Sequence, residues 1–430
     1  MTPPIPPSDP PRVALVTYST KPRGGVVHTL SLAEAMVEGG MPVRVVSLGD
    51  PDHDPDHHPD KGFYRPVRAP YTLVPAPEPR ETLEERVFAS VDALEQGLAS
   101  IADEVDIFHT QDCISARAAA RVRDAGADVR VVRTVHHVDD FTTAALIECQ
   151  RQAILEPDQL VVVSQDWRTR LHADYGRTAV VIHNGVDATR FPPIEPARRD
   201  ALRHELGLSD RFIFLAVGGI EPRKGSVYLL QALAILARDL DRAPALVVVG
   251  GHSFQDYSAY RDDALAMLPD LGLELGRDVI LAGTVSDAAL HGYYRSADAL
   301  AFPSVKEGWG LAVLEAMTAD LPVVASDIPV LHEYLTDHET AVLTRVGDPQ
   351  SLADGLREVV TDAALRAQLI EGGRSLVPEY SWERAAREHQ MLYAEAERGP
   401  CGGDNEPRDA STIGAHAHTK MDVPAKVEGL

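Results

Sequence analysis

Short apolar runs alternate along this chain with longer stretches in which apolar residues recur every three or four positions. The first run, 12–18, is followed by a loop with two glycines, a helical pattern over 26–38 and a second run over 43–48. A strand, a loop, a helix and another strand in this order open a parallel, doubly wound unit. The pattern continues with a helical stretch over 82–99 and with apolar runs at 107–109, 129–134, 159–163 and 179–182.

The alternation pauses near Asp187 and begins again after two prolines and a charged helix predicted over 196–206. The strands predicted for the second unit are 212–217, 245–249, 279–281, 299–302, 322–325 and 341–344. A strongly periodic helix, 382–396, comes last. Because 430 residues are too many for one core, the sequence predicts two similar α/β domains, 12–190 and 197–380.

Other segments show neither the apolar runs typical of buried strands nor the helical pattern of apolar residues. We expect disorder in the proline-rich residues 1–11 and in the tail 398–430, which is rich in Gly, Asp and His. The segment 50–79 is crowded with Asp, His and Pro and is expected to be mostly irregular. Within it, 52–60 holds three histidines among four aspartates, which suggests a metal site. Prolines break the spacing that a metal site needs, so we favour a flexible acidic loop.

Composition narrows the possible partners. The formal net charge of −24 argues against binding to nucleic acid or to an anionic membrane through bulk electrostatics. Three cysteines stand far apart, which fits a reducing compartment and no structural zinc. The N-terminus lacks the apolar core of a signal peptide, and no apolar run has the length of a membrane span. We therefore expect a cytoplasmic protein with at most peripheral membrane contact.

The most informative motif is PSVKEGWGLAVLEAM at 303–317, which reads as a strand end, a glycine loop and a helix. The helix that begins after Gly310 offers unpaired N–H groups and a positive dipole end to a phosphate. Gly308 and Gly310 let the backbone approach a ligand closely. Glu307 and Glu315 can accept hydrogen bonds from sugar hydroxyls. A nucleotide sugar has all the groups that this motif is suited to bind.

This motif belongs to an ordered series that resembles the retaining glycosyltransferases of family 4. The matching motifs in the first unit are Gly24-Gly25, His109 in Asp-Ile-Phe-His, His136 in Arg133-Thr-Val-His, Ser164, and Asn184-Gly-Val-Asp187. In the second unit they are Lys224-Gly225, Gly283, Ala297-Asp298, Pro303-Ser304, Glu307 to Glu315, and 322–327. Each match alone is weak, but the set is specific and covers about Val13 to Ala396. The resemblance implies the GT-B fold, in which two Rossmann-like doubly wound domains face each other across a cleft and the last helix packs on the first domain.

The resemblance also assigns roles to residues. It implies that Lys224 contacts the diphosphate of the donor, Glu307 the transferred sugar and Glu315 the ribose. His136 would approach the sugar at the reaction centre, and His109 would line the cleft. Together these imply His136, Lys224 and Glu307 as catalytic residues. The other positions expected to contact the donor are Gly24, Gly25, Arg223, Gly283, Gly308, Trp309, Gly310 and Leu311.

One position departs from the family pattern. Gly219 stands where relatives usually have an arginine of the diphosphate site, and the neighbouring Arg223 is the candidate to replace it. The departure concerns the diphosphate site and not the fold.

The resemblance implies transfer of a hexosyl unit from a nucleotide sugar to an acceptor hydroxyl with retained configuration, generally by front-face attack. No cofactor is expected, and no metal, because Asp50-Pro-Asp52 lies in the irregular segment rather than at a strand end. Two alternatives stay open: a nucleotide-sugar epimerase or hydrolase of the same fold, and a non-catalytic nucleotide-sugar-binding protein. The donor base, the sugar, the acceptor and the oligomeric state do not follow from the sequence.

Overall fold

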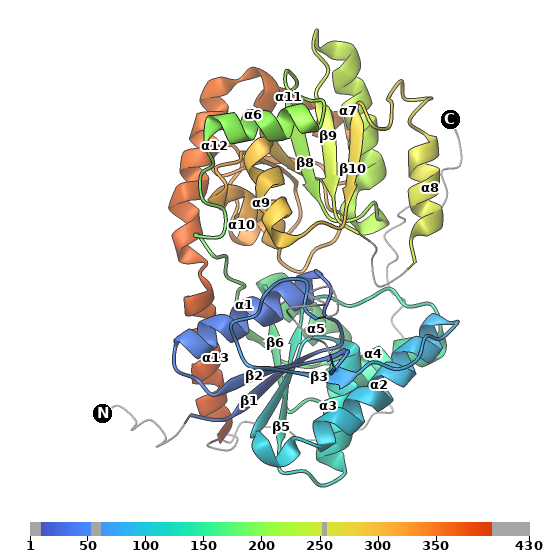
Figure 1. The fold of residues 1–430 in the computed structure, drawn as a ribbon, viewed down its shortest axis with the longest axis vertical. Coiled ribbons are helices and arrows are strands. Elements are labelled where there is room, and N and C mark those ends of the chain that lie inside the picture. Colours follow the sequence, from blue (N-terminus) through green and yellow to red (C-terminus); the bar gives the residue numbers. More distant parts are fainter. Residues whose placement is uncertain (1–9, 53–61, 252–255, 398–430) are drawn as a thin grey trace.

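The computed structural model describes residues 10–52, 62–251 and 256–397, and consists of two α/β halves stacked along the long axis of the molecule (Figure 1). The expectations for residues 1–9 and 398–430, and for the histidine-rich loop within 53–61, lie outside the described residues. Each half is built around a parallel sheet, so the predicted fold of two Rossmann-like domains is confirmed.

The first sheet has seven parallel strands in the order β3-β2-β1-β4-β5-β6-β7. Its strands are β1 Val13–Thr17, β2 Val43–Gly49, β3 Tyr71–Pro75, β4 Ile107–Thr110, β5 Arg130–Val135, β6 Gln159–Val162 and β7 Val180–Val181. The helices between them are α1 Gly24–Glu38, α2 Leu83–Ala99, α3 Cys113–Asp124, α4 Ala144–Leu155 and α5 Gln165–Tyr175. All five residues of β1 are buried. Val13 and Leu15 pack on one face of the sheet and Ala14 and Val16 on the other, which explains the unbroken apolar run.

The second sheet has six strands in the order β10-β9-β8-β11-β12-β13. Its strands are β8 Ile213–Val217, β9 Ala245–Val249, β10 Val279–Gly283, β11 Ala299–Phe302, β12 Val323–Ser326 and β13 Val342–Thr344. Its helices are α6 Pro196–Glu205, α7 Ser226–Asp239, α8 Ser258–Ala266, α9 Asp287–Ser296, α10 Leu311–Thr318, α11 Pro349–Thr361 and α12 Ala363–Leu376. The strand order reverses between β8 and β11, and ligands of open α/β sheets bind beside the strand ends at such a point.

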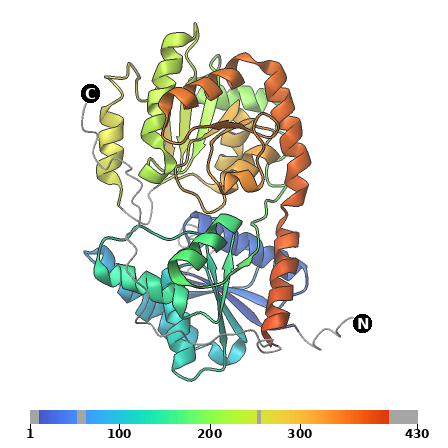
Figure 2. The same ribbon diagram turned by 180° about the vertical axis from the view of Figure 1, so that it is seen from behind.

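The last helix, α13 Trp382–Glu397, leaves the second half and packs against α1 of the first (Figures 1 and 2). Trp382 and Tyr393 are buried in the same apolar cluster as Leu30 of α1. The start of α13 also lies close to the segment that follows β7, because a Cβ on Gly185 would lie 2.2 Å from the backbone nitrogen of Trp382. The two halves are therefore joined both by the linker after Asp187 and by the chain that enters α13.

The first half differs from the predictions in two places. The described part of the segment 50–79 is mostly irregular, as expected, but it contains the edge strand β3, Tyr71–Pro75, whose ends are exposed and whose last residue is proline. Such a strand gives only a weak apolar run. Gly24 and Gly25 also do not lie in a loop: they are the first two residues of α1, and Arg23 is its N-cap.

Candidate active site

The loop between β11 and α10 forms the centre of the candidate site. Gly310 ends this loop with φ of 95°, a conformation that residues with a Cβ rarely adopt, and α10 begins at the next residue. A Cβ on Gly310 would also lie 2.9 Å from the hydroxyl oxygen of Tyr334. The loop therefore needs glycine at this position to direct the N-terminus of α10 toward the cleft.

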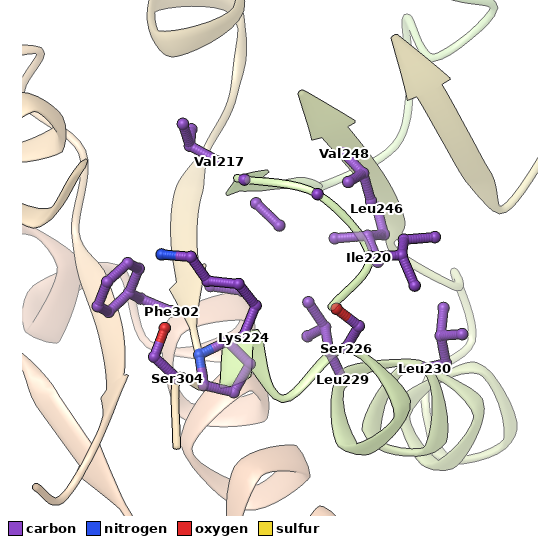
Figure 3. A pocket seen from close by; sticks show the side chains of 15 residues that line it. Val217, Ile220, Lys224, Ser226, Leu229, Leu230, Leu246, Val248, Phe302 and Ser304 are labelled. Atoms are coloured by element: carbon purple, nitrogen blue, oxygen red, sulfur yellow. The ribbon is translucent and has the colours of Figure 1, made fainter. Parts of the chain in front are cut away.

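Lys224 and Glu307 form a largely buried ion pair beside this loop. The Nζ atom of Lys224 lies 2.6 Å from Oε1 of Glu307, and the two side chains are only 16% and 9% exposed. Figure 3 shows the Lys224 side chain extending toward Phe302, whose ring centroid is 5.0 Å from Nζ. Burial raises the pKa of Glu307, but Lys224 and then Arg223 outweigh this, so its pKa is lower than usual. Glu307 is therefore a carboxylate near neutral pH.

The position of Lys224 depends on a tight turn. Residues Pro222–Lys224 form a single 3-10 turn that ends at Gly225, whose φ is 65°. A Cβ on Gly225 would lie 2.1 Å from the carbonyl oxygen of Pro303. Glycine thus brings the turn against the end of β11, and the turn and the strand end together line a small cavity of about 30 Å³ (Figure 3).

Arg223 adds a second cation to the site. Its Nε lies 3.0 Å from Oε2 of Glu221, and its Nη1 lies 3.6 Å from Oε1 of Glu307. No side chain fits at Gly219 without a shift, because a Cβ there would lie 2.6 Å from the carbonyl oxygen of Gly251. An arginine, which the family resemblance implies at this position, would therefore have no space in this arrangement of the backbone, whereas Arg223 reaches the pair from the adjacent turn.

His136 comes to the same loop from the first half. Its carbonyl oxygen approaches Gly308 so closely that a Cβ on that glycine would lie 2.2 Å away, and its ring lies near Gly25. The Nε2 atom of His136 lies 3.1 Å from Oε1 of Gln111. Burial, followed by the charges of nearby histidines, lowers the pKa of His136 to about 3. The imidazole is therefore neutral near pH 7.

Glu315 is buried and has partners on both oxygens. The hydroxyl of Tyr294 donates to Oε2 at 2.8 Å, and Arg190 of the linker pairs with Oε1. The carboxylate lies at the wall of a cavity of about 160 Å³ between α1, the linker and α10. Other residues that line this cavity are Ser31, Glu34, Arg65, Asp287 and Leu311.

The other residues expected to contact the donor differ in how accessible they are. Gly24 and Gly283 have open space where a Cβ would point, and Gly283 ends β10 with φ of 67°. Leu311 is half-buried at the start of α10. Trp309 as a whole residue is 2% exposed, and its ring stacks on His183 with ring centroids 4.6 Å apart. The Trp309 side chain therefore supports the loop from within and does not face solvent.

The expectation that His109 lines the cleft is wrong. His109 is fully buried behind α13, where its ring nitrogens lie 2.6 Å from the hydroxyl of Tyr393 and 2.7 Å from Oγ1 of Thr134. Sequence reasoning also missed residues that contact the expected ones. Gln111 follows β4 by one residue, a position that could have drawn notice, but no local pattern marks Arg190 or Tyr294 as partners of Glu315.

Within the described ranges, no group of three or more His, Cys, Asp and Glu side chains is arranged to hold a metal ion. Among the same residues, no helix combines the length and apolar character that crossing a membrane requires.

Comparisons with known proteins identify the family and the fold. The family described as Glycosyltransferase Family 4 matches residues 22–190, and the family described as Glycosyl transferases group 1 matches residues 198–376. The chain is 30% identical over 311 residues to the D-inositol 3-phosphate glycosyltransferase of Saccharomonospora viridis, which covers 68% of this chain and 70% of the relative. The chain belongs to the family 4 glycosyltransferases. This glycosyltransferase is also 28% identical over 415 residues to the D-inositol 3-phosphate glycosyltransferase of Xylanimonas cellulosilytica, which covers 90% of this chain and 97% of the relative.

Solved structures of GT-B enzymes share the fold of this glycosyltransferase. Anabaena Alr3699/HepE, in complex with UDP and glucose, superimposes with a TM-score of 0.73 at 19% identity and covers 90% of this chain and 100% of its own. Sucrose-phosphate synthase from Thermosynechococcus elongatus also has a TM-score of 0.73, at 22% identity, and covers 91% of this chain and 100% of its own. The expected fold and the expected enzyme class, a glycosyltransferase, are both confirmed.

Proposed function

We propose that this glycosyltransferase moves a hexosyl unit from a nucleoside-diphosphate sugar to an acceptor hydroxyl, with retained configuration and without a metal ion. The observation that carries this proposal is the buried Lys224–Glu307 pair beside the N-terminus of α10. When the bond between the anomeric carbon and the donor phosphate breaks, negative charge develops on the leaving diphosphate. Fixed cations and backbone dipoles that are already aimed at this charge lower the barrier.

In this proposal the diphosphate lies between the two halves. Lys224 and Arg223 supply two positive charges, and the N–H groups at the start of α10 supply the helix dipole. Gly24 and Gly25, at the positive end of α1 in the first half, would approach the diphosphate from the other side. In this proposal the donor is surrounded by Gly283, Gly308, Trp309, Gly310 and Leu311.

The sugar lies between Glu307 and His136. Glu307 accepts hydrogen bonds from sugar hydroxyls, because Lys224 holds its carboxylate in the charged form. His136 is a neutral imidazole that Gln111 holds, so it can hydrogen-bond the sugar without adding charge. Retention then proceeds by front-face attack: the acceptor oxygen bonds to the anomeric carbon on the side that the diphosphate leaves, and the acceptor proton passes to the leaving phosphate oxygen. The step requires no nucleophilic carboxylate.

The named relatives and neighbours suggest which substrates to test first. The Anabaena enzyme was crystallised with UDP-glucose and with UDP and glucose, which favours UDP-hexoses as donors. Curated relatives are D-inositol 3-phosphate glycosyltransferases, which makes D-inositol 3-phosphate the first acceptor to test. A phosphorylated cyclic polyol has several hydroxyls that could act as the acceptor group.

The test is to incubate the protein with UDP-, GDP- and ADP-hexoses, with and without D-inositol 3-phosphate or a cell extract. Mass spectrometry should reveal a glycosylated product only when an acceptor is present, and NMR should find the anomeric configuration of the donor in the product. Excess EDTA should leave the rate unchanged. Donor isomerisation without an acceptor would favour an epimerase, and an inverted product or a loss of activity with EDTA would overturn the proposed mechanism.

A further inference from the structure

Arg190 lies in the linker between the two halves, far in sequence from the motif that contains Glu315. We propose that Arg190 is a positioning residue that holds the Glu315 carboxylate in the orientation needed to bind the ribose hydroxyls of the donor nucleotide. The inference rests on the proposed function, because it assumes that the cavity beside Glu315 receives the ribose.

The Glu315 carboxylate is fixed from two sides. Arg190 pairs with Oε1 through Nη1, and the hydroxyl of Tyr294 donates to Oε2 at 2.8 Å. A carboxylate oxygen can accept two hydrogen bonds, so one lone pair on each oxygen stays available to a ligand. Two donors on different oxygens also prevent rotation about the last side-chain bond. A pair of vicinal hydroxyls could then meet both oxygens without reorganisation of the carboxylate.

Arg190 is itself held in place. Its second nitrogen, Nη2, pairs with Oδ1 of Asp287 at the first residue of α9, and its guanidinium lies 5.1 Å from the ring centroid of Phe191. The side chain of Arg190 is only 18% exposed. The planar fork of arginine suits this bridge between two carboxylates, and the flexible point charge of lysine cannot reproduce it.

Tyr294 makes the arrangement rigid. The tyrosine is fully buried, and its ring packs edge-on against Phe191 with centroids 4.7 Å apart. The residue beside Arg190 thus supports the second donor to Glu315. Arg190, Asp287, Leu311 and Glu315 all line the same cavity of about 160 Å³, so the oriented carboxylate borders a space that a ligand can enter.

The same contacts could instead serve only to fasten the linker to α9 and α10. The two roles differ in one measurable respect. If Arg190 only stabilises the linker, its loss should weaken the binding of ribonucleotides and dideoxynucleotides equally. If Arg190 positions Glu315, its loss should weaken the binding of ribonucleotides more than that of dideoxynucleotides.

The experiment measures dissociation constants by calorimetry for UDP, GDP and ADP and for their 2′,3′-dideoxy analogues. The wild-type protein should bind its preferred ribonucleotide at least about 100-fold more tightly than the dideoxy form, since two hydrogen bonds to a carboxylate are lost. Arg190→Met should reduce this ratio to about 3-fold or less, and Arg190→Lys should restore it only in part. Arg199→Met is the matched control, because Arg199 lies in α6 and pairs with Asp298.

Tyr294→Phe removes a single donor and serves as a second variant if Arg190→Met does not fold; it should reduce the ratio to an intermediate value. An Arg190→Met or Tyr294→Phe protein that folds and keeps the wild-type ratio would overturn the positioning role and leave the proposed function intact. Equal binding of both nucleotide forms by the wild-type protein, or no nucleotide binding at all, would instead remove the ribose assignment of Glu315 and this inference with it.

Discussion

The carbonyl oxygen of His136 occupies the position where a side chain on Gly308 would begin. A Cβ built on Gly308 would lie 2.2 Å from that oxygen, a distance that no relaxed contact allows. The two residues come from different halves of the molecule, so glycine at position 308 permits the halves to approach to this distance. Trp167 reinforces the contact from the first half, since its indole nitrogen donates to the carbonyl oxygen of Glu307 at 3.0 Å.

Gly308→Ala should therefore slow turnover more than it weakens nucleotide binding. A methyl group would force the halves apart at the sugar, and misplacement on this scale costs on the order of 10-fold or more in rate. The nucleotide site on the second half would change little. Steady-state kinetics together with calorimetric binding of the nucleotide would separate the two effects. Gly292→Ala is the control, because a methyl group there meets only the flexible end of Leu202; equal rates for both variants and the wild type would contradict the prediction.

Removal of either partner of the buried ion pair should reduce turnover strongly. We expect Lys224→Ala and Glu307→Ala each to lower turnover by about 100-fold or more, because each removes a charge aimed at the reacting groups. Both proteins should stay folded by circular dichroism. Glu274→Ala, which alters a surface ion pair with Arg277, should keep wild-type activity. Near-normal rates in both Lys224 and Glu307 variants would show that this pair does not act on the substrate.

Arg223 should account for part of the affinity for the diphosphate. Arg223→Met is expected to raise the dissociation constant for the nucleoside diphosphate by about 10-fold, and by much less for the nucleoside itself. Arg277→Met is a control on the surface of the same half. Gly219→Arg should not rescue Arg223→Met, because the carbonyl oxygen of Gly251 occupies the space that a side chain at 219 needs. Full rescue by this double change would disprove the assignment.

Buried neutral histidines should make the first half sensitive to acid. Burial lowers the pKa of His389 from 6.5 to about 4, although a hydrogen bond to the carbonyl oxygen of Ala385 opposes this. Between pH 6.5 and pH 4 His389 is protonated in the unfolded chain but not in the folded chain. The free energy of unfolding therefore decreases as the pH is lowered from about 6.5 to about 4. At pH 5 the loss from this residue alone is about 2 kcal/mol.

His389→Gln should reduce the difference in unfolding free energy between pH 7 and pH 5 by about this amount, about 2 kcal/mol. Urea denaturation followed by tryptophan fluorescence would measure it. His172→Gln, at an exposed position of α5, should leave the difference unchanged. An identical pH dependence in His389→Gln and the wild type would show that the folded protein accepts the proton.

The sequence alone determined the fold and the ends of the strands that carry the site. Ala245–Val249 and Ala299–Phe302 were predicted to the residue, because a strand buried on both faces has an apolar side chain at every position. Gly310 marked the loop before α10 for a local reason, since its φ of 95° depends on the residue itself, whereas the need for glycine at 308 comes from the approach of His136 in the other half. The edge strand β3 was missed because its few buried positions leave little trace in the pattern.

Only the tertiary structure decided which side chains meet. Lys224 and Glu307 are 83 residues apart in the chain, and Arg190 and Glu315 are 125 apart. It also placed His109 behind α13 instead of in the cleft. Hydrophobic periodicity reports whether a position is buried, but not which distant element buries it. The pairing of charges across the linker and the two halves depends on how whole sheets and helices stack, and that information is spread over the entire chain.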